Sequence, residues 1–597
     1  MAKRARRAPD AHSEAAPLHA FAGSRTLLAL VLALAAALRL GHVLSLRSLP
    51  LFDTLIVDSA LYDAWARRIA AGDWLGGTGA FFMDPLYSYV LAVVYRVLGH
   101  DLLVVRLLQI ALGVGTCALV AWIGRRVAGP AVGNGAALLL AVYRPAIFQE
   151  AEVEKTALGV FLVTAALALA LAHRPAARLG AGACLGLAAL TRGNLLLLAP
   201  LGVLWLLFDT PEAAPGERPA WRARLTGSAG RGAAAFLAGF LAVVSVVAVR
   251  NHHVSGEWIL TTAHGGQNFY TGNNPANRTG AYEYVPFVRP EPQFEQNDFH
   301  AEAEARTGRR MTSREVSTFW FGAGLRHIAE RPGWAARLFL KKLVLFWSDF
   351  EMPDAWDMYF LARYSPVLRL PLLGMGLLLP LAVLGAAAGF RRRREIRLLT
   401  GFALVYSASV IAFFIFSRYR LHVVPALTVL AACGVVWAVD VARARDARRA
   451  AAGALAACGV AAFSFLASRS FDVGPREDPQ SAISLAWLYR ERGEYRAAER
   501  LLVEALAAQR DGARAGPLCA LGDLHLRERD VDRAVGALEE CARANPAFPN
   551  ALVRLGIAYE ARGWPDRARA AYELQLQIVP GNDDARLRLM RLLGAGP

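Results

Sequence analysis

The stretch TLLALVLALAAALRLGHVLSL, Thr26 to Leu46, decides the fold class of this chain. It is apolar over the length of about 20 residues that a helix needs to cross a lipid bilayer. It is too long for the core of a signal peptide, and no cleavage site with soluble sequence follows it, so we expect it to remain as the first membrane-spanning helix. Residues 1–25 are basic and predicted to be a disordered cytoplasmic tail, whereas residues 47–101 form a first external loop.

The chain repeats this apolar pattern up to about residue 470. Of its 597 residues 55% are apolar, with a mean hydropathy of +0.33, and about eleven runs have the length of a span. The net charge of +17 does not indicate nucleic-acid binding, because the arginines stand in short clusters between apolar runs. If these clusters are cytoplasmic, the loops at 47–101 and 251–366 are external. We therefore expect an integral protein of a bacterial inner membrane.

After residue 471 the sequence becomes rich in charged residues and alanine, and its pattern is that of helices. Three helix-pair units are visible, in which Ala498, Ala534 and Ala568 take equivalent positions 36 and 34 residues apart. This period resembles tetratricopeptide repeats, whose stacked helices usually present a concave surface to a protein partner. Cys519 and Cys541 lie in this region and could pair if it faces an oxidising periplasm. We predict an all-α fold, with a transmembrane bundle over residues 26–470 and an α-solenoid over residues 478–597.

We expect the catalytic residues in the stretch DSALYDAWARRIAAGDW, Asp58 to Trp74. It follows the first span and carries Asp58 and Asp63 on a short amphipathic helix, between one and two turns apart and close to Tyr62 and Trp65. The competing interpretation is that these are solvated acids of an external loop, since exposed carboxylates are common.

Four motifs in order carry a resemblance to a known family. They are Asp58 with YDAWA at 62–66, DPLYSYVLAVVYRVLG leading to RLLQ at 84–109, LTRGNLLLLAP at 190–200 and SRYRLHVVPAL at 417–427. Over residues 26–440 the chain is similar to the GT-C superfamily of membrane glycosyltransferases, in the bacterial branch related to the protein mannosyltransferases and to the aminoarabinose and Rgt-type transferases. The resemblance implies transfer of a sugar from a polyprenyl-phosphate carrier outside the membrane. It makes Asp58 the expected base for the acceptor hydroxyl, with Asp53, Asp63 and Asp84 as alternates.

Cations are expected at the same membrane face, because the leaving group is a lipid phosphate. A guanidinium suits a phosphate, and ionisable groups at the ends of spans are candidates for function. Snorkelling to lipid headgroups is the alternative. The candidate phosphate-binding residues are Lys155, Arg192, Arg418, Arg420 and His422.

A loop at 264–284, HGGQNFYTGNNPANRTGAYEY, interleaves aromatic rings with amides and glycines. Rings against pyranose faces and amides toward hydroxyls suit sugar recognition, although a turn-rich loop explains the same composition. Glu150, Glu152 and Glu154 in QEAEVEK could hold Mg²⁺ or Mn²⁺ with Asp58, with Glu152 and Glu154 as the candidate ligands, but a solvated acidic turn is the simpler interpretation. The candidate sugar or acceptor contacts are Gln267, Asn268, Tyr270, Asn273 and Asn274.

These features together favour a membrane glycosyltransferase that places a sugar on a glycan, lipid or protein acceptor, with repeats that bind the acceptor or a partner protein. Two alternatives stay open: a transporter or flippase for lipid-linked glycans, and a ligase that transfers a whole oligosaccharide. A third alternative, a non-catalytic scaffold, leaves the acidic loop without a role. The sequence lacks a Walker loop, a dinucleotide fingerprint and an HExxH helix, which argues against nucleotide hydrolysis and zinc proteolysis.

Overall fold

The computed structural model describes residues 23–172, 174–208, 221–289, 292–470, 479–509, 514–579 and 581–594. Within these ranges the chain forms helices and no strand, and two isolated bridges, Tyr143 with Leu373 and Ala281 with Ile415, are the only β pairings. The prediction of an all-α fold is therefore confirmed. The predicted tail lies, up to residue 22, outside the described residues.

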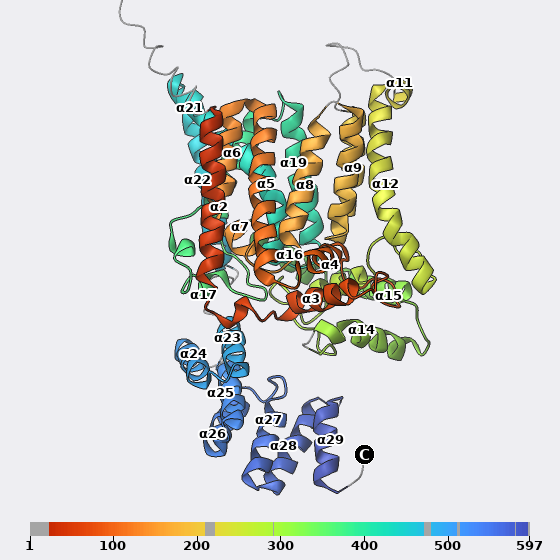
Figure 1. Ribbon diagram of the computed structural model, residues 1–597, viewed down its shortest axis with the longest axis vertical. Helices are drawn as coiled ribbons and strands as arrows, with labels where there is room; N and C mark the ends of the chain where they lie inside the picture. Colours follow the sequence, from red (N-terminus) through yellow and green to blue (C-terminus); the bar gives the residue numbers. More distant parts are fainter. Residues whose placement is uncertain are drawn as a thin grey trace, which may run out of the picture. The chain divides into compact units, whose positions relative to one another are not determined.

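The helices divide into two compact units, of which the first is the apolar bundle (Figure 1). It comprises the chain up to Ser45, Leu55–Asp354, and the part from Tyr364 to the end of α22. Its first helices are α2 (Arg25–Ser45), α3 (Val57–Ala70), α4 (Leu86–Leu98), α5 (Leu102–Ala128), α6 (Pro130–Ala141), α7 (Arg144–Gln149), α8 (Thr156–Leu171), α9 (Pro175–Ala189), η2 (Gly193–Leu197), α10 (Leu198–Phe208), α11 (Trp221–Thr226) and α12 (Ser228–Ser255). The others are α13 (Gly265–Asn273), α14 (Pro292–Thr307), α15 (Ser313–Glu330), α16 (Pro332–Trp347), η3 (Val367–Arg369), α18 (Met375–Gly389), α19 (Arg394–Ile411), α20 (Ser417–Arg420), η4 (Leu421–Val423), α21 (Val424–Arg443) and α22 (Ala447–Ser470).

Five helical segments of this unit are long and apolar enough to cross a membrane within the described residues. They are Arg25–Ser45, Leu102–Ala128, Ser228–Ser255, Ser417–Arg443 and Ala447–Ala467. Shorter apolar helices accompany them, and the expected total of about eleven spans stays a prediction. Figure 1 shows α2, α5, α6, α8, α9 and α12 side by side, with α3, α4, α14 and α15 gathered at one end of the bundle. We call this the loop end.

Small residues allow the helices of the bundle to approach closely. A Cβ at Gly182 would lie 1.8 Å from the backbone oxygen of Phe236, and one at Gly239 would lie 2.0 Å from that of Leu179. These two contacts join α9 to α12. At Gly434 a Cβ would meet the backbone oxygen of Leu381, which joins α21 to α18. Packing through small residues is expected inside a bilayer, where lipid tails remove the hydrophobic drive for helix association.

The second unit is built from the repeats. Ala498, Ala534 and Ala568 are fully buried where the two helices of each repeat cross, as their period predicts. Cys519 and Cys541 form a disulfide bond between α25 and α26. Its elements are η1 (Pro50–Phe52), α17 (Met358–Leu361), α23 (Gln480–Glu491), α24 (Tyr495–Ala508), α25 (Ala515–Arg527), α26 (Val531–Ala544), α27 (Ala551–Arg562), α28 (Pro565–Ile578) and α29 (Asp583–Leu592).

Two loop segments of the chain's first part, Leu46–Thr54 and Ala355–Arg363, pack within this repeat unit. Arg492 forms an ion pair of 3.1 Å with Asp53, and the backbone N–H of Asp357 donates to the Ser481 hydroxyl at 2.8 Å. The predicted boundaries at 470 and 478, which place the repeats after the bundle along the chain, stay a prediction. They do not capture these two segments, because only tertiary contacts assign them to the repeats.

Candidate active site

Arg418 is the centre of a buried cluster of carboxylates at the loop end. It lies in α20, and its side chain is 6% exposed. Its guanidinium forms ion pairs with Asp58 at 2.9 Å, with Glu154 at 2.8 Å and with Asp354. The three acids come from α3, from the turn between α7 and α8, and from the loop behind α16. Three carboxylates around one cation leave an excess of negative charge in a largely buried space.

The local backbone places Asp58 at this cluster. The helix α3 begins at Val57, so Asp58 stands in its first turn, where the helix dipole stabilises a carboxylate. Val57 has φ of 52°, a left-handed conformation that a β-branched residue rarely adopts. Such strain persists only where the surrounding structure enforces it, and it often marks a functional site.

Burial and charge separate the pKa values of these acids. Burial alone would favour the neutral form of Asp58, but Arg418 outweighs it and lowers the pKa of this carboxyl below its ordinary value. For Asp354 burial prevails over Arg418 and raises the pKa to about 6, and burial raises that of Glu152 to about 8. Asp58 is also the most accessible of the three partners of Arg418, with 29% exposure against 7% for Glu154 and 18% for Asp354. It is thus the ionised acid that a substrate reaches most easily.

A second group of polar side chains adjoins the cluster. Lys155 forms an ion pair with Asp84, and its ammonium lies 5.4 Å from the centre of the Tyr62 ring. His264 lies in the electrostatic field of Asp84, Lys155 and Asp58, and burial lowers its pKa. One oxygen of Asp84 and Nδ1 of His264 are buried without a hydrogen-bond partner within the described residues. These two atoms have the capacity to bind a ligand group.

The described part of the chain contains no group of three or more His, Cys, Asp or Glu residues arranged to hold a metal ion. Glu154 is instead committed to Arg418, and Glu152 lies in the field of Glu154 and Arg106. The suggestion that these two glutamates bind Mg²⁺ or Mn²⁺ stays a prediction.

The predicted phosphate-binding cations occupy different surroundings. Arg420 is 1% exposed and donates to the backbone oxygens of Ser348 and Phe350 while it pairs with Glu351, so it fastens a loop. The guanidinium of Arg192 lies 3.7 Å from the centre of the Tyr419 ring, and no ion pair to an acid is found for it among the described residues. Among the candidate phosphate-binding residues, Arg192 is therefore the cation whose charge is not neutralised by an ion pair in the described part of the chain. His422 stacks on Tyr406 with ring centres 5.3 Å apart.

Of the three alternates for the base, Asp63 and Asp53 are engaged in other ion pairs. Asp63 accepts hydrogen bonds from Tyr95 and His100, both at 2.7 Å, and pairs with Arg67, so it is committed to a separate network. Asp53 belongs to the repeat unit, where it pairs with Arg492. Asp84 joins the site through Lys155.

The amides of the 264–284 loop bond mainly within the protein. Asn273 donates to the backbone oxygens of Phe269 and Ala412 and accepts from Lys342 at 2.9 Å. Asn274 donates to the backbone oxygen of Thr271, and its side-chain oxygen accepts from a backbone N–H. Tyr270 packs against Trp320. These contacts fold the loop, and a role in sugar binding for Gln267, Asn268, Tyr270, Asn273 and Asn274 stays a prediction.

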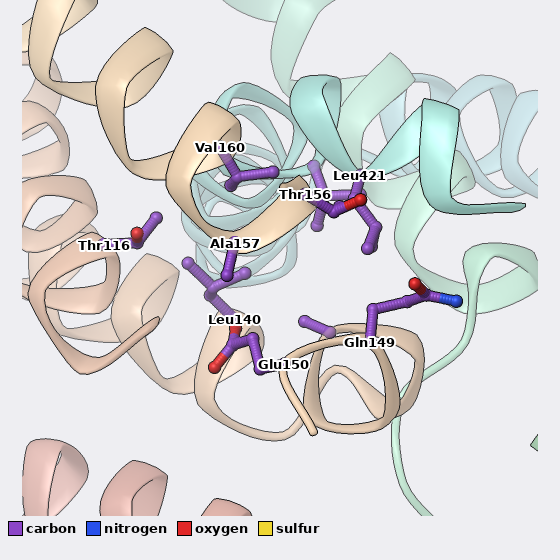
Figure 2. A pocket seen from close by; sticks show the side chains of 10 residues that line it. Thr116, Leu140, Gln149, Glu150, Thr156, Ala157, Val160 and Leu421 are labelled. Atoms are coloured by element: carbon purple, nitrogen blue, oxygen red, sulfur yellow. The ribbon is translucent and has the colours of Figure 1, made fainter. Parts of the chain in front are cut away.

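A small cavity of about 20 Å³ lies within the bundle and is lined by residues of α5, α6, α7, α8, η4 and α21. Figure 2 shows Gln149 and Glu150 on one wall and Thr116, Ala157 and Val160 among the others. Glu150 pairs with the buried Arg39 of α2 at 2.5 Å. A space of this size has room for about one water molecule, so it is not a substrate pocket.

Sequence reasoning missed Asp354 and His264. His264 is the first residue of the 264–284 loop, in which the rings and amides indicate sugar recognition, and Asp354 stands in a loop with other acids. Only the contact with Arg418 and the field of Asp84 mark these two residues as part of the site.

The bundle and the Arg418 cluster define a helical membrane protein with a buried acid–base site at the loop end. Residues 83–217 match the family described as dolichyl-phosphate-mannose-protein mannosyltransferase, and residues 481–514 match the tetratricopeptide repeat. Residues 83–217 therefore resemble a glycosyltransferase domain of the GT-C type, and tetratricopeptide repeats follow in the chain. The resemblance recognised in the sequence is confirmed. Among curated proteins no sequence matches the chain.

Several solved structures are similar. ArnT from Cupriavidus metallidurans bound to undecaprenyl phosphate is 16% identical, with 91% of this chain and 80% of ArnT covered and a TM-score of 0.39. The apo oligosaccharyltransferase of Archaeoglobus fulgidus is 16% identical, with 77% of this chain and 57% of that protein covered and a TM-score of 0.37. A MamA mutant is 26% identical over 20% of this chain, with 69% of MamA covered and a TM-score of 0.17. This chain thus spans less than two thirds of the oligosaccharyltransferase.

Proposed function

We propose that this protein transfers a sugar from a polyprenyl-phosphate carrier to a hydroxyl of a glycan, lipid or protein acceptor. The family match supports the reaction class. The observation that carries the proposal is the pairing of Arg418 with Asp58, an ionised and accessible carboxylate beside a helix long enough to span the membrane. A lipid-linked donor presents its anomeric carbon at the membrane surface, where this carboxylate can take a proton from the acceptor.

In this reaction the acceptor oxygen forms a bond to the anomeric carbon while the bond from that carbon to the phosphate oxygen breaks. Asp58 takes the hydroxyl proton, and the electron pair of the broken bond leaves with the lipid phosphate. Arg192 is the cation suited to the phosphate, because its guanidinium is not paired with an acid among the described residues. Lys155 contributes positive charge nearby, although it is partly neutralised by Asp84.

The repeats are proposed to lie in the periplasm and to bind the acceptor or a partner protein. The disulfide bond between Cys519 and Cys541 supports this side of the membrane, because such bonds persist in oxidising compartments. Three stacked helix pairs also supply the kind of surface with which such repeats hold other proteins. The bacterial inner membrane and the external orientation belong to the same proposal.

The test is sugar transfer by the purified protein in lipid nanodiscs. Synthetic polyprenyl-phosphate hexoses and pentoses serve as donors, and an extract of bacterial envelope serves as acceptor. We expect Asp58→Asn to lower transfer by about a hundredfold or more. Asp53→Asn is the matched control, because Asp53 is an alternate for the base whose side chain is 68% exposed in the repeat unit. It should transfer at the wild-type rate.

The outcomes separate the alternatives. Equal transfer by the wild type and Asp58→Asn would remove Asp58 as the base. Movement of the intact donor across the membrane without sugar release would favour the flippase. Release of a whole glycan from a diphosphate carrier, but of no single sugar, would favour the ligase.

A further inference from the structure

Four large apolar side chains stand exposed on two loops of the bundle unit. Trp74 and Leu75 lie on the loop that follows α3, and Trp258 and Leu260 lie on the loop that follows α12. Their exposed fractions range from 47% to 60%. We call these two segments the tryptophan loops. Groups of exposed apolar residues mark surfaces that contact another protein or a lipid bilayer, so these loops indicate a contact that the site described so far does not include.

The end of α12 holds the first tryptophan loop in place. The Arg250 guanidinium donates to three backbone oxygens of this loop, among them that of Leu75 at 2.7 Å. The Tyr89 hydroxyl of α4 donates to the backbone oxygen of Trp74, also at 2.7 Å. Backbone groups on both exposed residues are thus bonded to helices of the bundle, and the fold itself presents the two side chains outward.

The second tryptophan loop is fixed to the same end of α12. The His252 ring stacks on the Trp258 ring, with centres 4.2 Å apart and planes 8° from parallel. The Asn251 amide donates to the backbone oxygen of Ile259 at 2.9 Å. Ile259 is buried in one apolar cluster with Ala80, which belongs to the segment of the first loop. The two tryptophan loops therefore pack together and form one surface.

This surface continues the exposed side of a membrane-spanning helix. Figure 1 shows α12 running along the bundle to the loop end, and its length and apolar composition suit a span. Val246, Val249 and His252 are exposed on it. They follow one another at intervals of three residues, which places them on one side of the helix. Because His252 stacks on Trp258, the exposed side of the span leads directly to the tryptophan loops.

We propose that the tryptophan loops are a membrane anchor, whose four exposed side chains enter the boundary between the lipid headgroups and the acyl chains at the loop end. Tryptophan is enriched at this boundary because its ring is apolar and its N–H is polar. Arg250 adds a cation beside the first loop, which suits the phosphates of lipid headgroups. The continuity with the exposed side of α12 favours the bilayer over a second copy of the chain or another protein as the occupant of this surface.

The anchor sets how far part of the candidate site lies from the lipid headgroups. The first tryptophan loop continues to Phe82 and Asp84, and the second continues to His264. The rings of Phe82 and His264 lie 5.3 Å apart, so the two chain segments meet again at the site. Asp84 and His264 carry the unpartnered buried atoms described above. Loops held at the bilayer surface therefore keep these two residues at a fixed depth.

The experiment measures the depth of nitroxide spin labels on the full chain in nanodiscs. Collisions with oxygen, which concentrates in lipid, are compared with collisions with a nickel chelate, which stays in water. The labels are attached to Leu75→Cys and Leu260→Cys, in a chain whose four free cysteines are replaced by alanine. Val246→Cys in the span is the lipid reference, and Ala301→Cys on the charged helix α14 is the water reference. We expect the ratio of oxygen to nickel collisions at Leu75 and Leu260 to be severalfold higher than at Ala301 and close to that at Val246.

Each outcome decides the question. A ratio equal to that at Ala301 would place the loops in water and overturn the anchor. Few collisions with either reagent would mean that protein covers the loops, which overturns it as well. If the cysteine-free background does not fold, lipids brominated near the headgroup should quench the tryptophan fluorescence of the wild type more than that of the double variant Trp74→Phe, Trp258→Phe, and equal quenching would contradict the anchor. Sugar transfer is not measured here, so a failure of the proposed function leaves these results unchanged.

Discussion

Replacement of Arg418 by glutamine is the sharpest test of how the site is held together. The substitution keeps hydrogen-bonding capacity and removes the one charge that three carboxylates share. Asp58, Glu154 and Asp354 would then face each other in a space where the arginine side chain is 6% exposed. Removal of one partner of a buried ion pair leaves uncompensated charge and costs about 3–5 kcal/mol.

The penalty depends on pH, and its sign follows from the protonation of the acids. Burial raises the pKa of Asp354 to about 6 even with Arg418 present, and loss of the arginine would raise it further. An acid whose pKa is higher in the folded than in the unfolded state costs stability that grows as the pH rises from the unfolded to the folded pKa and is constant above the folded pKa. A further rise in the folded pKa therefore adds cost only at pH values above the original folded pKa. The deficit of Arg418→Gln should therefore be largest above about pH 7 and shrink as the pH falls to about 5.

The assay is thermal unfolding of the full chain in nanodiscs, followed by the fluorescence of its 13 tryptophans. The matched control is Arg289→Gln, which breaks the pair with Asp298, because that arginine side chain is 54% exposed. An exposed pair contributes about 1 kcal/mol or less, so the control should unfold close to wild type. If Arg418→Gln unfolds at the wild-type temperature at about pH 8, or if its deficit is the same at about pH 5, the reasoning is refuted.

Three further predictions concern other parts of the molecule. Replacement of both Cys519 and Cys541 by serine should destabilise the repeats by about 3 kcal/mol and speed their cleavage by protease in the full chain, whereas unchanged cleavage would argue against a stabilising bond. Gly434→Val should reduce the yield of folded protein, because a Cβ there would lie 2.1 Å from the backbone oxygen of Leu381; size-exclusion chromatography measures this, and a wild-type yield would contradict the close approach. Arg192→Met should raise the KM for the donor about tenfold or more while Arg192→Lys raises it less, and equal KM values for all three proteins would exclude Arg192 from phosphate binding.

Several elements of this protein could be predicted from local sequence. The predicted span Thr26–Leu46 starts and ends within one residue of the bounds of the helix Arg25–Ser45. The repeat period placed Ala498, Ala534 and Ala568 at buried crossings. Both succeed because hydrophobic length and period are local properties that neighbouring residues carry.

Other features escaped prediction because they arise from distant contacts. Arg420 shares a motif with Arg418, yet it pairs with Glu351 and backbone oxygens while Arg418 pairs with three acids. The two arginines stand two residues apart. No pattern in the sequence shows which of them holds a loop through backbone oxygens and which pairs with three carboxylates. The pairing of Asp53 with Arg492 likewise joins segments more than 400 residues apart.

The sequence by itself determined that the chain is an all-helical membrane protein with tetratricopeptide repeats, and it made Asp58 the candidate base. Only the tertiary structure decided which charges meet, namely Arg418 with Asp58, Glu154 and Asp354. The physical reason is that helix formation and membrane insertion depend on runs of neighbouring side chains. The protonation of an acid depends instead on burial and on charges within a few ångströms, which come from segments far apart in the chain.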